Sequence, residues 1–84
     1  MIGKAIYIDV REPFEFSAGH VENAINVPLG YISQDNESLQ SIDKSTKVVL
    51  YCRSGARAEQ AKSVLQSLGF TDVENGINQQ SIEK

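Results

Sequence analysis

The chain has 84 residues with one cysteine and one histidine, which excludes an intramolecular disulfide and a structural zinc site built from four such ligands. The length allows a single domain over residues 1–84, and 40% hydrophobic with 23% charged residues is an ordinary globular composition. The net charge of −3 argues against nucleic acid or an anionic membrane as a partner.

The first half of the chain predicts two strands joined by a helix. Residues 5–10 form a short apolar run with β-branched and aromatic side chains, which is typical of a strand. Residues 12–18 predict one short helix, which ends at Gly19. Residues 24–27 predict a second short strand, because Pro28 cannot continue a central strand.

The second half begins with a less regular stretch. The apolar positions of residues 29–46 predict one or two short helices, with a break at residues 34–36. Residues 47–51 are almost continuously apolar, as expected of a parallel strand covered on both faces. Residues 57–68 have apolar positions three and four apart, which predicts a helix with one apolar face. Gly69 suits the left-handed cap of that helix.

The chain is predicted to end in a strand, a turn and a loose tail. Residues 70–74 predict the last strand, and Asn75-Gly76 is a turn signal. The polar residues 77–84 predict a frayed tail. Because strands and helices alternate with short connections, we expect an α/β fold: a central parallel sheet of about four strands with helices on both faces.

Cys52 follows the predicted strand 47–51 and begins the loop 52–57, which contains two of the three arginines. Ligands bind at the carboxyl edge of parallel sheets, and a helix N-terminus with a glycine-containing loop favours an anion. Such a position favours the thiolate, the nucleophilic form of cysteine. A lone cysteine after an apolar strand is more often a small buried hydrophobic residue. The flanking arginines and glycine nevertheless favour a nucleophile acting on an anion.

His20 is the only histidine that could serve the thiol as a base. Its position at a predicted helix end favours a hydrogen-bonded structural residue. Amide hydrolysis would need an acid for the amine leaving group, whereas sulfur transfer to a thiolate needs no dedicated base. The residues therefore favour sulfur transfer.

Three segments resemble the rhodanese domain, the sulfurtransferase fold. Residues 7–12 resemble the strand-ending Asp-x-Arg-Glu motif, residues 19–28 the Gly-His segment that ends in Asn-x-Pro, and residues 51–58 the active-site loop. The resemblance covers about residues 5–76, and the three segments in this order and spacing are specific. The short, single-domain members are the most similar.

The resemblance implies a cysteine that accepts a sulfane sulfur and holds it as a persulfide. Cys52 would be the nucleophile. The loop backbone that would hold the persulfide and bind substrate belongs to five residues: Arg53, Ser54, Gly55, Ala56 and Arg57. The side chains of Arg57 and Arg53 would attract an anionic donor.

Other charged residues are expected to have structural or no special roles. Asp9 and Arg11 match family positions that organise the fold near the loop, and a strand-end Asp-x-Arg can pair internally. Glu12 and Glu15 are expected to be solvated charges at a helix start. Related phosphatases place an arginine six positions after the cysteine, where this chain has Ala58. The shorter loop favours sulfur over phosphate or arsenate chemistry.

The resemblance also bears on assembly. This chain starts at the Asp-x-Arg-Glu strand, whereas larger members have a strand and a helix before it. A smaller core makes a monomer or a weak homodimer the expected state. Five apolar residues are candidates for exposure: Phe14, Phe16, Leu29, Tyr31 and Ile32.

The expected function is that of a thiosulfate sulfurtransferase without cofactor or metal. Its partners would be a small anionic donor and a cyanide or thiol acceptor, with a protein as a further donor or acceptor. A sulfur-relay or partner-binding module is the main alternative, and a redox-sensing thiolate is a third. Because no second cysteine exists, a persulfide must be discharged by an acceptor from outside the chain.

No apolar run approaches the ~20 residues that span a bilayer, and the N-terminus lacks the long apolar segment of a signal peptide. We expect a cytoplasmic protein, or a periplasmic one if a signal peptide has been removed.

Overall fold

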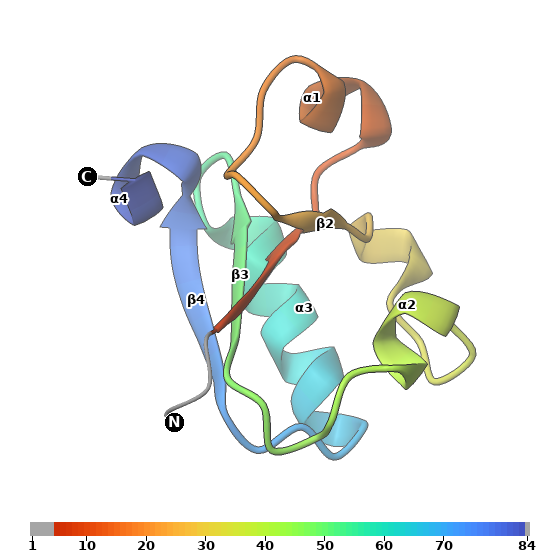
Figure 1. Cartoon of the computed structure of the whole chain (residues 1–84). Helices are drawn as coiled ribbons and strands as arrows, with labels where there is room; N and C mark the ends of the chain where they lie inside the picture. The colour runs from red at the N-terminus through yellow and green to blue at the C-terminus, as the bar shows by residue number, and fades with distance from the viewer. Residues whose placement is uncertain (1–4, 84) are drawn as a thin grey trace.

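A four-stranded parallel sheet forms the centre of the computed structural model, which describes residues 5–83 (Figure 1). The strand order is β2-β1-β3-β4. The strands are β1 (Ile6–Asp9), β2 (Ile25–Asn26), β3 (Val48–Cys52) and β4 (Val73–Asn78). The expected α/β fold with four parallel strands is confirmed.

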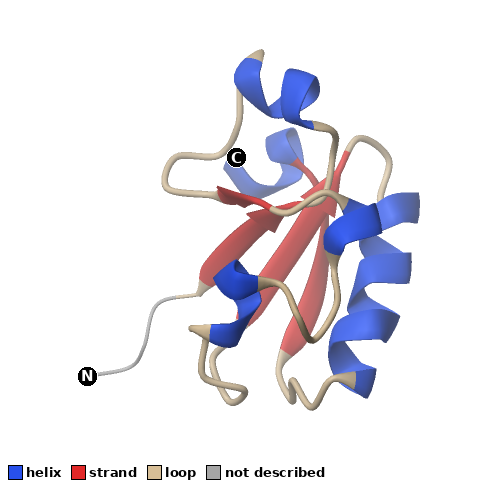
Figure 2. Ribbon diagram, turned by 90° about the vertical axis from the view of Figure 1, so that its right-hand side faces the viewer, coloured by secondary structure: helices blue, strands red, loops and turns tan. Residues whose placement is uncertain are grey.

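Helices lie against the sheet and at its carboxyl edge. They are α1 (Pro13–Ser17), the 3-10 helix η1 (Leu29–Tyr31), α2 (Glu37–Gln40), α3 (Ala56–Ser67) and α4 (Gln79–Glu83). Figure 2 shows the longest of them, α3, lying along one face of the sheet. Of the residues that the structure describes, none belongs to a helix long and apolar enough to cross a membrane.

The strand β3 is buried along its whole length because both of its faces are covered. Side chains alternate between the faces of a strand. Val48, Leu50 and Cys52 belong to the hydrophobic cluster that also contains the buried face of α3. On the other face, Val49 lies near Ile82 of α4, since both contact the space beside Gly76. The predicted continuous apolar strand and the predicted helices on both faces are therefore present.

The predicted elements before residue 70 agree with the structure to within about two residues, except in residues 29–46, where the helical structure ends at Gln40 and the break spans residues 32–36. The predicted break at residues 34–36 separates η1 from α2, so residues 29–46 contain two short helices. One difference concerns Cys52, which is the last residue of β3 rather than the first of the loop. The sheet therefore fixes the backbone of Cys52 by pairing with Asn78, and the residues that follow it surround the sulfur.

The C-terminal prediction was right about a last strand but wrong about its bounds, the turn and the frayed tail. The strand β4 begins at Val73 and continues to Asn78 through the predicted Asn75-Gly76 turn. The pairing with β3 is irregular there: Leu50 pairs with Asn75, but Cys52 pairs with Asn78. A β-bulge thus uses the turn-like residues inside a strand.

The tight packing around position 76 explains why the bulge needs a glycine. A Cβ at this position would lie 2.7 Å from Cγ1 of Val49 and 3.0 Å from Cδ1 of Ile82. The predicted frayed tail is instead the end of β4 and the helix α4, and only Lys84 of it lies outside the described residues. The tail is ordered because Ile82 packs over this glycine.

The expected exposed apolar residues divide into three groups. Phe14 and Tyr31 are 75% and 67% exposed. Phe16 and Leu29 are half-buried. Ile32 is only 7% exposed and belongs to the core, which corrects its assignment as a surface candidate.

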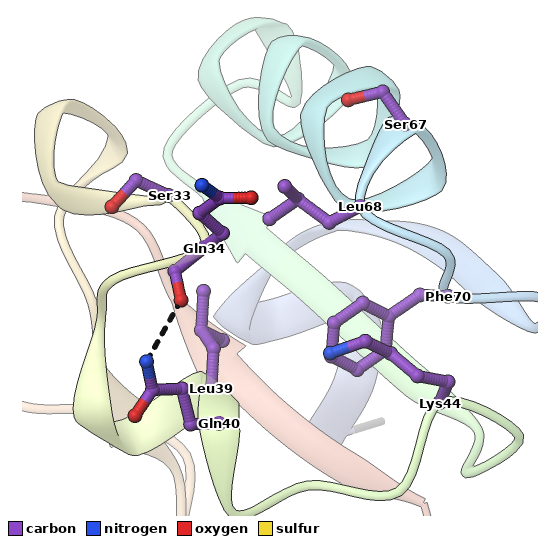
Figure 3. A pocket seen from close by; sticks show the side chains of 8 residues that line it. All are labelled: Ser33, Gln34, Leu39, Gln40, Lys44, Ser67, Leu68 and Phe70. Atoms are coloured by element: carbon purple, nitrogen blue, oxygen red, sulfur yellow. Dashed lines mark hydrogen bonds between the residues drawn. The ribbon is translucent and has the colours of Figure 1, made fainter.

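A shallow depression of about 160 Å³ lies between α2 and the C-terminal end of α3 (Figure 3). Lys44 closes one side, with its Nζ 4.4 Å from the centroid of the Phe70 ring, and Gln40 donates to the backbone oxygen of Gln34. The Cys52 loop leads into the other end of α3, and a helix of this length extends roughly 18 Å. The depression is therefore remote from Cys52.

Candidate active site

Cys52 lies at the carboxyl end of β3, where the chain turns into α3. Its side chain is buried, with the residue 2% exposed. The backbone N–H of Gly55 donates to Sγ over 3.1 Å. Gly55 has φ of 95°, in the left-handed region that side chains resist, and it directly precedes α3. The glycine therefore turns the loop so that its N–H groups face the sulfur.

Two opposing effects set the acidity of Cys52. Burial is the larger single effect and raises the pKa of the thiol, but the backbone N–H groups of Ala58, Ser54, Gly55 and Arg57 together outweigh it. The pKa of Cys52 is therefore held below its ordinary value, which favours the thiolate. Ala58, in the first turn of α3, joins the donors that the sequence predicted.

Asn75, in the bulge of β4, holds the loop in place through its side chain. The side chain of Asn75 donates to the backbone oxygen of Gly55 over 3.0 Å and to Oε1 of Glu59, also over 3.0 Å. Its own oxygen accepts the N–H of Ile77 at 2.9 Å. Sequence reasoning missed this residue because Asn-Gly is foremost a turn signal.

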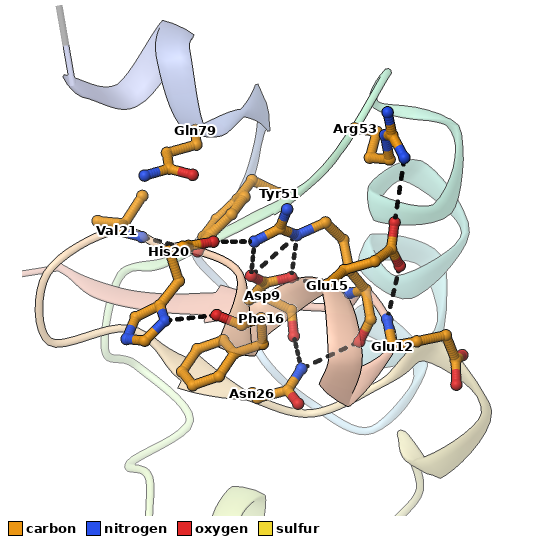
Figure 4. A network of polar contacts seen from close by, with 12 residues as sticks. Asp9, Glu12, Glu15, Phe16, His20, Val21, Asn26, Tyr51, Arg53 and Gln79 are labelled. Atoms are coloured by element: carbon orange, nitrogen blue, oxygen red, sulfur yellow. Dashed lines mark hydrogen bonds and ion pairs between the residues drawn. The ribbon is translucent and has the colours of Figure 1, made fainter.

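Glu15 connects α1 to the cysteine loop. Its carboxylate accepts from Nη1 of Arg57 at 2.9 Å and from Nη2 at 3.2 Å. Oε2 also lies 3.8 Å from Nη1 of Arg53, as Figure 4 shows. The expectation of a solvated charge at Glu15 was wrong, because its side chain is only 11% exposed.

The ion pair shifts the acidity of Glu15. The hydrogen bonds from Arg57 are the main cause that lowers the pKa of Glu15 to about 2. Oε1 also accepts the backbone N–H of Glu12 at 2.8 Å, which completes a capping box at the start of α1. The three-residue spacing of Glu12 and Glu15 was the one sequence signal that could have shown that the Glu15 side chain is held by hydrogen bonds. Glu12 itself is exposed, as expected.

Asp9 and Arg11 pair with each other directly beside the site. Nη2 of Arg11 lies 2.6 Å from Oδ2 of Asp9, and Nε donates to both carboxylate oxygens at 2.9 and 3.0 Å. Arg11 also donates to the backbone oxygen of Gly19 at 2.7 Å. The fully buried Asp9 thereby ties the end of β1 to the segment that precedes β2.

Tyr51 and His20 belong to the same polar network but differ in surroundings. The Tyr51 hydroxyl accepts the backbone N–H of Val21 at 3.0 Å, and burial raises the pKa of Tyr51 to about 12. His20 is exposed, stacks on Phe16 at 3.6 Å between ring centroids, and its Nδ1 lies 2.8 Å from the Phe16 oxygen. In the described part of the chain no hydrogen bond joins His20 to Cys52, which fits a structural histidine.

An open depression of about 320 Å³ borders Cys52. Six residues line it: Arg11, Cys52, Arg53, Asn78, Gln79 and Gln80. The amide side chains come from the end of β4 and from α4. Sequence reasoning missed them because it treated this segment as a tail, and nothing in its polar composition marked it as part of a site.

The structure brings the sequence-predicted residues together in two groups. In the first group, Cys52 at the end of β3, the loop residues 53–55 and the first turn of α3 lie around the sulfur, and the side chains of Ser54 and Ala56 are exposed. Asp9 and Arg11 form the second group, of which Arg11 reaches the depression beside Cys52. A thiolate among backbone N–H groups, with guanidinium groups at its edge, can attack an electrophilic sulfur and stabilise an anionic product.

Comparisons with known proteins agree with this geometry. The family model Rhodanese-like domain matches residues 1–79. The chain is 39% identical over 69 residues to thiosulfate sulfurtransferase PspE of Escherichia coli, covering 82% of this chain and 65% of that protein. It is 37% identical over 79 residues to tRNA uridine(34) hydroxylase of Hamiltonella defensa, covering 87% of this chain and 22% of that protein.

The chain thus spans less than two thirds of the length of these curated relatives. A solved structure described as rhodanese with anions from E. coli superposes with a TM-score of 0.84 at 35% identity, covering 95% of this chain and 93% of that chain. The fold, the cysteine loop and these comparisons agree, and the chain belongs to the rhodanese-like domain family.

Proposed function

We propose that this chain is a sulfurtransferase that moves a sulfane sulfur from thiosulfate or a similar anionic donor to cyanide or a thiol. The observation that carries the proposal is the position of the Cys52 sulfur, buried at the end of β3 with the Gly55 N–H 3.1 Å away. The same N–H groups that favour the thiolate would favour a persulfide anion at the next atom.

In the first step the Cys52 thiolate attacks the outer sulfur of thiosulfate. A new S–S bond forms, the bond between the two thiosulfate sulfurs breaks with its electron pair, and sulfite leaves as a dianion. The product is the Cys52 persulfide anion, so that charge is conserved and no proton moves. A step without proton transfer fits a site in which His20 is bonded to Phe16.

In the second step an acceptor attacks the outer sulfur of the persulfide. With cyanide, a C–S bond forms, the S–S bond of the persulfide breaks with its electron pair going to the Cys52 sulfur, and thiocyanate leaves as the Cys52 thiolate is regenerated. Because these 84 residues contain no second cysteine, a thiol acceptor comes from outside them. The depression beside Cys52, lined by two arginines and three amides, offers polar groups to such a molecule.

Thiocyanate formation from thiosulfate and cyanide tests the proposal, with Cys52→Ala as the control. We expect turnover by the wild type and only the uncatalysed rate with the variant. Equal rates for both proteins would contradict the proposal. The control is matched because alanine keeps the strand end apolar and removes only the sulfur.

A sulfur-relay module is the second candidate. It is favoured by the match to tRNA uridine(34) hydroxylase, because the matched segment is only 22% of that longer protein. The two candidates differ in the donor that loads Cys52. Turnover on thiosulfate alone supports the enzyme, whereas loading only by a persulfide-carrying protein such as a cysteine desulfurase supports the relay.

A further inference from the structure

Glu15 is placed where a negatively charged substrate would be expected to bind. Its carboxylate bridges the guanidinium groups of Arg57, at 2.9 and 3.2 Å, and Arg53, at 3.8 Å. Among the residues that the structure describes, it is the only carboxylate within 4.0 Å of either arginine. A planar carboxylate and the oxygens of a sulfonate group make the same kind of hydrogen bonds to a guanidinium.

The charge balance of the loop follows from this contact. Arg11 is neutralised by Asp9, so it adds no net charge. The two loop arginines are balanced by the Glu15 carboxylate and by Cys52 when it is a thiolate. The reactive form of the site therefore carries no net positive charge, although three arginines surround it. A dianion is attracted weakly to such a site.

We propose that Glu15 is a specificity-determining residue that disfavours dianionic sulfur donors relative to donors with one negative charge. The inference rests on the proposed function and deepens it, since it concerns the donor of the same site. Its physical basis is that a fixed negative charge repels a dianion twice as strongly as a monoanion. The donor class favoured is a monoanionic sulfane compound, such as a thiosulfonate or the persulfide of a small thiol.

Two donors that react at the same kind of S–S bond but differ in charge can show whether Glu15 acts through its charge. Thiosulfate carries two negative charges and releases sulfite. Methanethiosulfonate carries one negative charge: its outer sulfur is transferred to the Cys52 thiolate, its S–S bond breaks, and methanesulfinate leaves as a monoanion. Both reactions give the same persulfide, so a change in the ratio of their kcat/KM values reports on charge at the donor site.

The decisive variant is Glu15→Gln. Glutamine keeps an oxygen that can accept the N–H of Glu12 and one N–H of Arg57, so α1 can stay attached to the loop. Removing one unit charge is expected to raise kcat/KM roughly threefold for methanethiosulfonate and roughly tenfold for thiosulfate at low salt. The gain should appear mainly in KM, and for thiosulfate it should shrink as the salt concentration rises.

Two further variants are matched controls. Glu22→Gln removes the same charge at an exposed position that forms no ion pair with the loop arginines, and the donor ratio should stay at the wild-type value. Glu15→Asp keeps the charge on a shorter side chain, and the ratio should also remain near the wild-type value. If Glu15→Gln lowers kcat/KM equally for both donors, or if Glu15→Asp changes the ratio as much, the proposal is overturned.

Alkylation of Cys52 tests the electrostatic effect without sulfur transfer. Iodoacetate is an anion and iodoacetamide is neutral, and both can modify only one thiol in this chain. Glu15→Gln should raise the rate ratio of iodoacetate to iodoacetamide roughly threefold. An unchanged ratio contradicts the role of Glu15. If this ratio rises while neither donor loads Cys52, the proposed function fails and the electrostatic role of Glu15 stands.

Discussion

The backbone N–H of Gly55 points at the sulfur of Cys52 across 3.1 Å, with two residues between them in the chain. The contact exists because β3 ends at Cys52 and Gly55 adopts a left-handed conformation before α3 begins. It places a buried thiol among hydrogen-bond donors that favour its anion. The reactivity of the site is therefore expected to follow from the loop backbone.

The alkylation of Cys52 by iodoacetamide should have a lower apparent pKa in the folded protein than in the urea-unfolded chain. The loop N–H groups favour the thiolate and are lost on unfolding, so the pKa of Cys52 moves back toward its ordinary value. The measurement is the alkylation rate as a function of pH for both states. If the pKa of Cys52 in the folded protein equals or exceeds the pKa in the unfolded chain, the effect of burial is at least as large as the effect of the loop N–H groups.

Acid should remove a part of the stability that depends on Glu15. The carboxyl group has a pKa of about 2 in the folded protein and near 4.5 when unfolded, so its contribution is complete above about pH 4.5. It is lost as the pH falls toward 2. We expect the free energies of unfolding of the wild type and Glu15→Gln to differ by about 1–2 kcal/mol at pH 6, to differ clearly less at pH 2.5, and to converge only below about pH 2. A pH-independent difference would contradict the ion pair as its source.

Gly76→Ala should destabilise the protein through the bulge in β4. The added Cβ would lie 2.7 Å from Val49, so the packing of β4 and α4 must shift. We expect a loss of roughly 1–3 kcal/mol in the free energy of unfolding by urea. Gly30→Ala is the matched control, because a Cβ there meets nothing within 4 Å. If the two substitutions lower the free energy of unfolding equally, the close contact between position 76 and Val49 does not contribute to stability.

Arg11→Ala should cost much more stability than Arg53→Ala. Without Arg11 the carboxylate of Asp9, which is fully buried, loses its charged partner, and the expected loss is about 3 kcal/mol. The side chain of Arg53 is 75% exposed, and its removal should change stability by less than about 0.5 kcal/mol. Thermal unfolding of both variants provides the comparison, and similar losses would contradict a structural role of the Asp9–Arg11 pair.

Short-range features of the site could be predicted from the sequence. The strand before Cys52, the glycine at position 55 and the helix that follows are encoded within about twenty consecutive residues, by apolar spacing and by a residue that tolerates positive φ. The internal pair of Asp9 and Arg11 is equally local, because only one residue separates them. These features need no information about the rest of the fold.

Long-range features could not be predicted in the same way. The contact between Glu15 and Arg57 joins residues 42 positions apart, and its formation depends on how α1 sits over the loop. The extension of β4 depends on a bulge in which Gly76 packs closely against Val49. The local Asn-Gly pattern indicates a turn instead. In both cases tertiary packing overrides a correct local tendency.

The most direct test of the central claim is the mass of the intact protein after incubation with thiosulfate and removal of excess donor. The account predicts a gain of one sulfur atom, located on Cys52 by fragmentation, removed by cyanide with release of thiocyanate, and absent from Cys52→Ala. An unmodified wild-type mass, or the same gain in Cys52→Ala, would contradict persulfide formation at Cys52.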